Sequence, residues 1–229
     1  MRSVSTVLLS RESGGLVDMS GTASELVRAS VRGDLAEVKR LLDAGADVNG
    51  TDQHGMGPLL TFKPEVTEFL LSRGADPNRQ LNESGTPVLI GVAYMNQAEC
   101  VRLLLQGGAN PKAANLQTGE TALHSCLSKP GDEAFERDRL ELVKLLLEAG
   151  ADPNHRTTPG VQTLAFWRDT RTRGETPLHR AAAYASEDTI RLLLNAGADK
   201  TIRDVNGDSP QSWASWHWRT RDLVLLLSP

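Results

Sequence analysis

A short string recurs along this 229-residue chain and constrains its fold more than any other feature. The string consists of two leucines, two or three further residues, and then Gly-Ala-Asp or Gly-Ala-Asn. Its copies are separated by 29, 34, 42 and 47 residues, and they place glycines at Gly45, Gly74, Gly108, Gly150 and Gly197. Self-similarity at such a period is typical of a solenoid, in which each unit packs only on its neighbours.

The fullest copy of the unit shows why it should form a pair of helices. Residues 174–182 read Gly-Glu-Thr-Pro-Leu-His-Arg-Ala-Ala. The hydroxyl of Thr176 can cap a helix, and Pro177 suits the first helical turn because no main-chain donor is needed there. The two alanines that follow are small enough for a second helix to approach closely. Gly197 ends that second helix, since helices commonly stop at a residue with positive φ.

This string resembles the Thr-Pro-Leu-His-x-Ala signature of ankyrin repeats. Degenerate copies precede it: residues 119–124 read Gly-Glu-Thr-Ala-Leu-His, and residues 85–89 read Gly-Thr-Pro-Val-Leu. The resemblance covers about residues 23–229 and implies an all-α ankyrin-repeat solenoid of about six helix-turn-helix units with hairpin loops. We expect a flexible leader at 1–22, followed by units at about 23–49, 50–78, 79–110, 111–154, 155–199 and 200–229.

Three units depart from the ankyrin period of about 33 residues. The second unit is short at residues 59–65, which predicts a first helix of about one turn and a locally weak or bent stack. The fourth unit has extra residues within 128–138, where a Pro-Gly-Asp string predicts a loop, and its next helix is expected at 139–148. The fifth unit carries an inserted loop at 155–173, in the hairpin that projects from ankyrin-like stacks.

The inserted loop and the inner helices beside it make up the predicted partner-binding surface. Its centre is aromatic and its flanks are basic, and Trp, Tyr and Arg are enriched in binding hot spots. Counting from the Thr-Pro-Leu-His string adds two residues of the fifth unit and the two equivalent residues of the sixth. The predicted surface comprises Phe166, Trp167, Arg168, Arg180, Tyr184, Trp213 and His217.

Two alternatives to this surface remain open. The aromatic side chains of the inserted loop can fold back and cover their own hairpin. The tryptophans of the sixth unit, Trp213, Trp216 and Trp218, can cover the open end of the array. If the predicted surface is not the site, the hairpins at Gln53-His54 and Asn82-Glu83 are the next candidates.

Charge separates along the chain and indicates the kind of partner. Residues 155–221 carry a net charge of +3 and residues 1–154 a net charge of −6, within a total of −4. An acidic, hydrophobic protein or peptide would therefore prefer the C-terminal half. The runner-up is a nucleic acid whose bases stack on the aromatic loop, although the overall acidity and the lack of Lys/Arg clusters disfavour it.

The sequence contains no motif for catalysis or cofactor binding. It has no phosphate loop, dinucleotide fingerprint or nucleophile elbow. His124 and His179 occupy the structural His position of the ankyrin string, and His124 with Cys126 lacks a second ligand pair for zinc. We therefore expect a protein-binding module that is not an enzyme and holds no cofactor or metal.

The cysteines and the hydropathy pattern suggest where the protein resides. Cys100 and Cys126 are interpreted as small buried hydrophobes, which favours a reducing compartment. No apolar stretch approaches the roughly 18 residues of a membrane helix. We expect a cytoplasmic monomer without membrane association.

Overall fold

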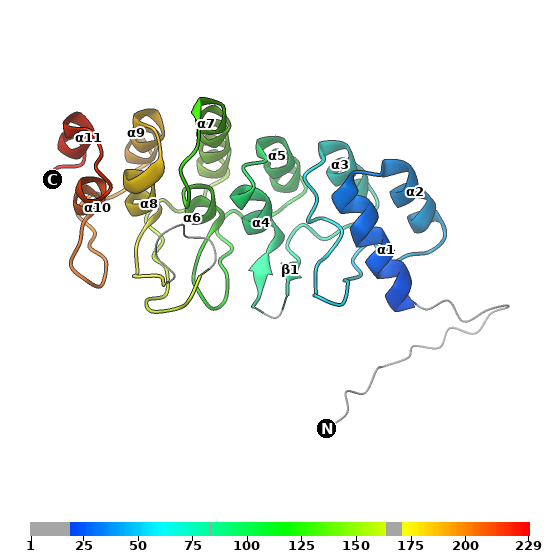
Figure 1. Ribbon diagram of the computed structural model, residues 1–229. Coiled ribbons are helices and arrows are strands. Elements are labelled where there is room, and N and C mark those ends of the chain that lie inside the picture. Colours follow the sequence, from blue (N-terminus) through cyan, green and yellow to red (C-terminus); the bar gives the residue numbers. More distant parts are fainter. Residues whose placement is uncertain (1–18, 83, 164–170) are drawn as a thin grey trace, which may run out of the picture.

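The computed structural model describes residues 19–82, 84–163 and 171–229. In this part of the chain, helices stack into one elongated array with two rows, and the loops lie along one side (Figure 1). The inner row, beside the loops, contains α1 (Met19–Arg32), α4 (Val88–Tyr94), α6 (Ala122–Cys126), α8 (Pro177–Tyr184) and α10 (Pro210–Trp216). The outer row contains α2 (Leu35–Asp43), α3 (Pro64–Ser72), α5 (Ala98–Gln106), α7 (Glu133–Glu148), α9 (Glu187–Asn195) and α11 (Arg221–Leu226). The all-α solenoid expected from the sequence is confirmed.

The fifth unit forms its helices for the reasons that its sequence indicates. The main-chain N–H of Thr176 donates to Nδ1 of His179 at 3.1 Å, closing a capping box in front of α8. Pro177 occupies the first turn of α8. The hydroxyl of Ser186 caps α9, and Gly197 follows that helix with φ +88°, a conformation that a residue with a Cβ adopts only under strain.

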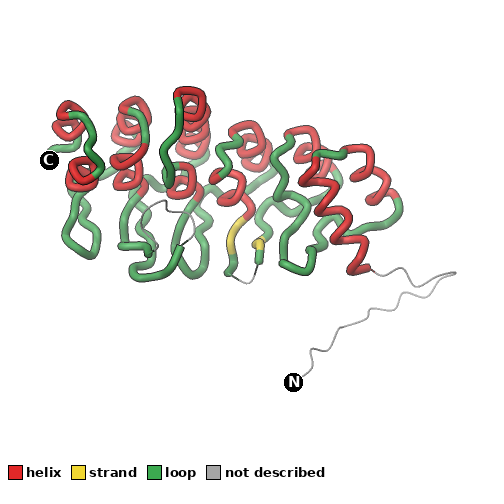
Figure 2. The backbone as a smooth tube through the Cα atoms, in the orientation of Figure 1, coloured by secondary structure: helices red, strands yellow, loops and turns green. Residues whose placement is uncertain are grey.

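The loops form a row of hairpins, here called fingers, that project together from the inner helices (Figure 2). One finger contains the short antiparallel pair β1 (Gln80–Leu81) and β2 (Thr86–Pro87). Asparagine side chains join the stems of neighbouring fingers. Asn154 donates to the carbonyl oxygen of Gly197 at 2.8 Å and accepts from the main-chain N–H of Asp199 at 2.7 Å. Asn49 and Asn78 make the same two bonds to the fingers that follow them.

The second unit differs from the prediction because its first helix is missing. Residues 50–63 contain turns and no helix, and α3 follows directly at Pro64. Pro64 disfavours a helical conformation at Lys63, and the segment is too short to place a helix before it. The side chain of Leu60 partly fills the space instead. A Cβ at Gly91 of α4 would lie 2.8 Å from Cδ1 of Leu60, so the glycine permits this close packing.

The fourth unit also differs, because much of the predicted loop at 128–138 is helical. Helix α7 begins at Glu133, where the carboxylate of Asp132 accepts from the main-chain N–H of Phe135 at 2.9 Å. Acidic residues in its first turn, Glu133 and Glu136, favour the positive end of the helix dipole. In the first unit, α1 begins at Met19, so residues 19–22 belong to a helix and not to the expected leader.

The core runs through all the units and is almost entirely aliphatic. Buried Leu, Val, Ile and Ala side chains form one continuous cluster from Leu26 to Leu227. Cys100 and Cys126 are buried within it, as expected. Burial raises the pKa of the Cys126 thiol to about 12, so this group stays protonated and unreactive at neutral pH.

We predict that Ala182→Leu destabilises the array by about 1–3 kcal/mol, because Ala182 is fully buried in α8 and a larger side chain would overpack the stack. Urea denaturation followed by circular dichroism measures the change. Ala134→Leu, at an exposed position of α7, is the matched control and should leave stability nearly unchanged. Equal stability of the two variants would contradict the packing described for α8.

Candidate interaction surface

The structure brings part of the predicted surface together. Tyr184 ends α8 and His217 follows α10, and their rings meet edge-to-face with centroids 4.9 Å apart. Both side chains are half-buried. Phe166, Trp167 and Arg168 lie outside the described residues, so their part of the prediction stays untested.

Arg180 and Trp213 are not surface residues, and this corrects the prediction. Arg180 is completely buried, and Trp213 is nearly so. The indole N–H of Trp213 donates to Oδ2 of Asp204 at 3.1 Å, and its ring lies edge-on to His179 with centroids 5.5 Å apart. Counting along a repeat placed both residues on inner helices, but inner helices are packed on both sides by their neighbours. These two side chains point into the stack.

The other C-terminal tryptophans are exposed. Trp216 is 52% exposed and Trp218 is 91% exposed. Trp218 has φ +55°, in the left-handed region that Gly33 occupies in the first unit, and such a conformation is uncommon for a bulky residue. Trp218 therefore does not cover the end of the array, and Trp213 is buried between the fifth and sixth units.

Arg180 is the centre of a buried ionic cluster that links two units. Its guanidinium contacts Glu120 at 2.7 Å and Glu175 at 2.6 Å, and it donates to the hydroxyl of Ser128 at 2.7 Å. The inserted loop contributes to the same cluster. The hydroxyl of Thr163 donates to both carboxylate oxygens of Glu120, at 3.0 and 2.8 Å.

The second carboxylate of the cluster binds the inserted loop as well. Oε2 of Glu175 accepts from the hydroxyl of Thr157 at 2.8 Å and from the main-chain N–H of Arg173 at 2.6 Å. Two buried carboxylates thus hold both arms of the inserted loop. The sequence carried a signal that our prediction missed: Glu120 and Glu175 occupy the same place in two Gly-Glu-Thr strings.

The electrostatics of the cluster keep Glu175 charged and His124 neutral. Burial would raise the pKa of Glu175, but the charge of Arg180 and several hydrogen bonds outweigh it and lower this pKa to about 2. Burial, aided by Arg180, lowers the pKa of His124 to about 3. A ring nitrogen of His124 lies 3.3 Å from the carbonyl oxygen of Glu175, and the corresponding contact of His179 is to Asp208 at 3.1 Å. Both histidines are structural, as predicted.

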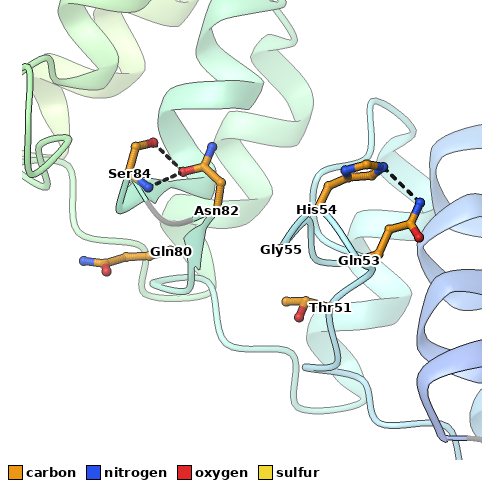
Figure 3. Close-up of a pocket in the computed structure, with 7 residues that line it drawn as sticks. All are labelled: Thr51, Gln53, His54, Gly55, Gln80, Asn82 and Ser84. Atoms are coloured by element: carbon orange, nitrogen blue, oxygen red, sulfur yellow. Dashed lines mark hydrogen bonds between the residues drawn. The ribbon is translucent and has the colours of Figure 1, made fainter. Parts of the chain in front are cut away.

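The N-terminal fingers offer a different surface. An open cleft of about 650 Å³ lies between the fingers at 51–55 and 80–84 (Figure 3). Gln53, His54 and Asn82, which the sequence singled out, line it together, while Glu83 lies outside the described residues. The side chains that line it carry amide, hydroxyl and imidazole groups, so this cleft can form hydrogen bonds with a partner.

Family comparison agrees with the helical pairs and fingers. Residues 60–157 match a family model described as ankyrin repeats in three copies, and residues 173–205 match one described as ankyrin repeat. The chain is an ankyrin-repeat protein. The second model covers α8, α9 and the finger between the fifth and sixth units. The capping histidine and the buried alanines of this ankyrin array therefore lie within the matched segment.

Relatives of this ankyrin array occur within larger proteins. E3 ubiquitin-protein ligase KEG of Arabidopsis thaliana is 33% identical over 93% of this chain and 15% of its own length. Nuclear factor NF-kappa-B p105 subunit of Gallus gallus is 29% identical over 73% of this chain and 16% of its own length. NF-kappa-B inhibitor delta of Homo sapiens is 30% identical over 54% of this chain and 35% of its own length. The array thus spans about a third or less of these relatives.

The ankyrin array is a protein–protein interaction module, as the family matches and these relatives indicate. Within the described ranges, no helix combines the length and the apolar character that a membrane span requires. In the same residues, no group of three or more His, Cys, Asp or Glu side chains is arranged to hold a metal ion.

We predict that Arg180→Met lowers the free energy of unfolding by about 3–5 kcal/mol at neutral pH, because it leaves two buried carboxylates without their cation. The triple variant Glu120→Gln/Arg180→Met/Glu175→Gln should recover much of this loss. Urea denaturation of the three proteins measures it. A triple variant no more stable than Arg180→Met would show that Arg180 stabilises the array by packing and not by charge.

The penalty of Arg180→Met should also depend on pH. The pKa of Glu175 is depressed from 4.5 to about 2, so its contribution is present above the ordinary value and is lost as the pH falls toward 2. The difference in unfolding free energy between the wild type and Arg180→Met should therefore narrow from neutral pH to about pH 3. The same denaturation series at each pH measures this, and a constant difference would contradict the ion pairing.

Proposed function

We propose that this ankyrin-repeat protein is a non-catalytic adaptor, scaffold or inhibitor that binds a protein or peptide through its fingers and inner helices. The observation that carries the proposal is the exposed aromatic group at the C-terminal inner helices. Trp216 keeps 52% of its surface exposed immediately before His217, which pairs with Tyr184. Trp and Tyr side chains are enriched in interaction hot spots.

Two of the three relatives named above favour binding, whereas the third is named an E3 ubiquitin-protein ligase. One is named an inhibitor of NF-kappa-B and another is a subunit of that factor, and neither name describes a catalytic activity. In this proposal the partner presents an acidic and hydrophobic segment, which complements the net +3 charge of residues 155–221. The protein acts as a monomer in the cytoplasm, in keeping with its two buried free thiols.

We predict that Trp216→Ala abolishes capture of the partner while the fold stays intact. The wild type and the variant are immobilised and exposed to cell extract, and the retained proteins are compared by mass spectrometry. Leu225→Ala is the matched control, since Leu225 is similarly exposed, at 54%, on the outer helix α11. A protein retained by the wild type and the control but lost with Trp216→Ala supports the proposal. Identical retained sets for all three proteins would count against it.

The contribution of the inserted loop needs its own variant. Because Trp213 is buried, a variant that combines Trp167→Ala with Trp213→Ala would report on folding and not on binding. Phe166→Ser/Trp167→Ala changes only the loop. We expect it to weaken capture and to leave the circular dichroism spectrum unchanged, and undiminished capture would remove the loop from the proposed surface.

A further inference from the structure

The three C-terminal fingers are joined to each other by direct hydrogen bonds. The main-chain N–H of Thr158 donates to the carbonyl oxygen of Thr118 at 2.8 Å. This bond links the finger of the fourth unit to the inserted loop of the fifth unit. The N–H of Val205 donates to the carbonyl oxygen of Arg173 at 2.9 Å, which links the inserted finger to the sixth. We call residues 113–121, 155–163, 171–176 and 203–209 the finger platform. With the buried carboxylates below it, this platform is held as one body.

Two apolar side chains project from the finger platform. Leu116 is 72% exposed and Val205 is 57% exposed, among the most exposed large apolar side chains in the described part of the chain. Each follows a residue, Asn115 or Asp204, whose side chain accepts main-chain N–H bonds and shapes a tight turn. Because these turns are already ordered, little conformational entropy is lost when a partner covers the two tips.

Exposed arginines surround the two tips. Arg156, Arg171 and Arg203 are exposed, and each donates to main-chain carbonyl oxygens. No carboxylate among residues 19–82, 84–163 and 171–229 forms an ion pair with these three side chains. The four arginines and four carboxylates of the platform balance in formal charge, but arginines are its exposed charged side chains.

The carboxylates of the same fingers are less exposed than these arginines. Glu120 and Glu175 are buried against Arg180, and Asp204 is buried against the indole of Trp213. Asp208 is half-buried, and burial together with the charge of Asp204 raises its pKa. The acids of the fingers are thus used inside the protein, and the arginines face the solvent.

The N-terminal fingers show that this combination is local. The position that corresponds to Leu116, directly after the turn-forming Asp52, is the polar Gln53. The cleft beside it is lined by neutral polar groups (Figure 3). Exposed apolar tips with unpaired arginines occur together on the finger platform and not at this end of the array.

We propose that the finger platform binds an extended acidic segment of a partner protein, with two apolar residues of that segment seated on Leu116 and Val205. This inference rests on the proposed function, and it specifies the binding surface and the chemistry of the ligand. The two tips lie on units two repeats apart, roughly 20 Å if packed helices are about 10 Å apart. An extended chain covers that distance in about six residues. The recognised segment therefore carries two apolar side chains about six positions apart, with Asp or Glu between them for the arginines.

A peptide selection tests this chemistry directly, because it does not require an identified partner. The intact protein is used to select from a displayed library of random peptides of about 16 residues, long enough to cross the platform. We expect the enriched peptides to be acidic and to contain the spaced apolar pair. The best peptide is then synthesised, and its affinity is measured for the wild type and for variants that circular dichroism shows to be folded.

Two double charge reversals with the same change in net charge test whether the position of the arginines matters for peptide binding. Arg171→Glu/Arg203→Glu changes the platform, whereas Arg137→Glu/Arg221→Glu makes the same net change on the outer helices α7 and α11. The platform variant should weaken peptide binding at least about tenfold, and the control should stay within about twofold. Leu116→Ser/Val205→Ser should weaken binding similarly, with Leu225→Ser as its control.

Other outcomes overturn the inference. The selection could enrich peptides that lack Asp and Glu, or it could enrich no peptide at all. Alternatively, the platform variant could bind the selected peptide with the affinity of the wild type. Tighter binding of single-stranded nucleic acid through the same arginines would also overturn it, since the ligand would then be a polyanion without apolar contacts. If peptides bind but respond only to Trp216→Ala, the platform is excluded and the proposed interaction function stands.

Discussion

No helical pair in this array can bury its apolar face alone, so every feature of the structure depends on packing between neighbouring units. The fully buried Ala181 and Ala182 show the requirement directly, because only small side chains let an inner helix contact a neighbour on each side. The second unit shows that packing between units continues even without an inner helix. That unit has lost its inner helix, yet its Thr61 hydroxyl still bonds the carbonyl oxygen of Ser30 at 2.7 Å, and Leu59 stays in the core.

Buried polar side chains also connect neighbouring units of the stack. Arg139 is buried and donates to the carbonyl oxygens of Lys129 and Tyr184, near the ends of two inner helices. Arg219 donates to the carbonyl oxygens of Ala182 and Ala185 at the end of α8. Arginine thus satisfies carbonyl groups that a helix end leaves unpaired, and its charge suits the negative end of the helix dipole.

The stack holds the fingers in fixed positions. Asparagine bonds join the stems of several fingers, and the cluster around Arg180 binds both arms of the inserted loop from below. Burying charge is costly unless it is paired, and here Glu120 and Glu175 share one guanidinium and take further hydrogen bonds from the loop. Arg156, Arg171 and Arg203 remain exposed outside the cluster.

The sequence by itself determined the repeat, the helical pairs and their caps, because Thr-Pro-Leu-His and Gly-Ala-Asp act through local backbone chemistry. It also indicated that the insertion leaves the array as a hairpin, and that His124 and His179 are structural. It did not determine that Arg180 and Trp213 are buried, that residues 50–63 form no helix, or that α7 begins at Glu133. Only the tertiary structure decided these points. The face of an inner helix that becomes buried depends on the neighbour packed against it, and a single repeat read alone does not contain that neighbour.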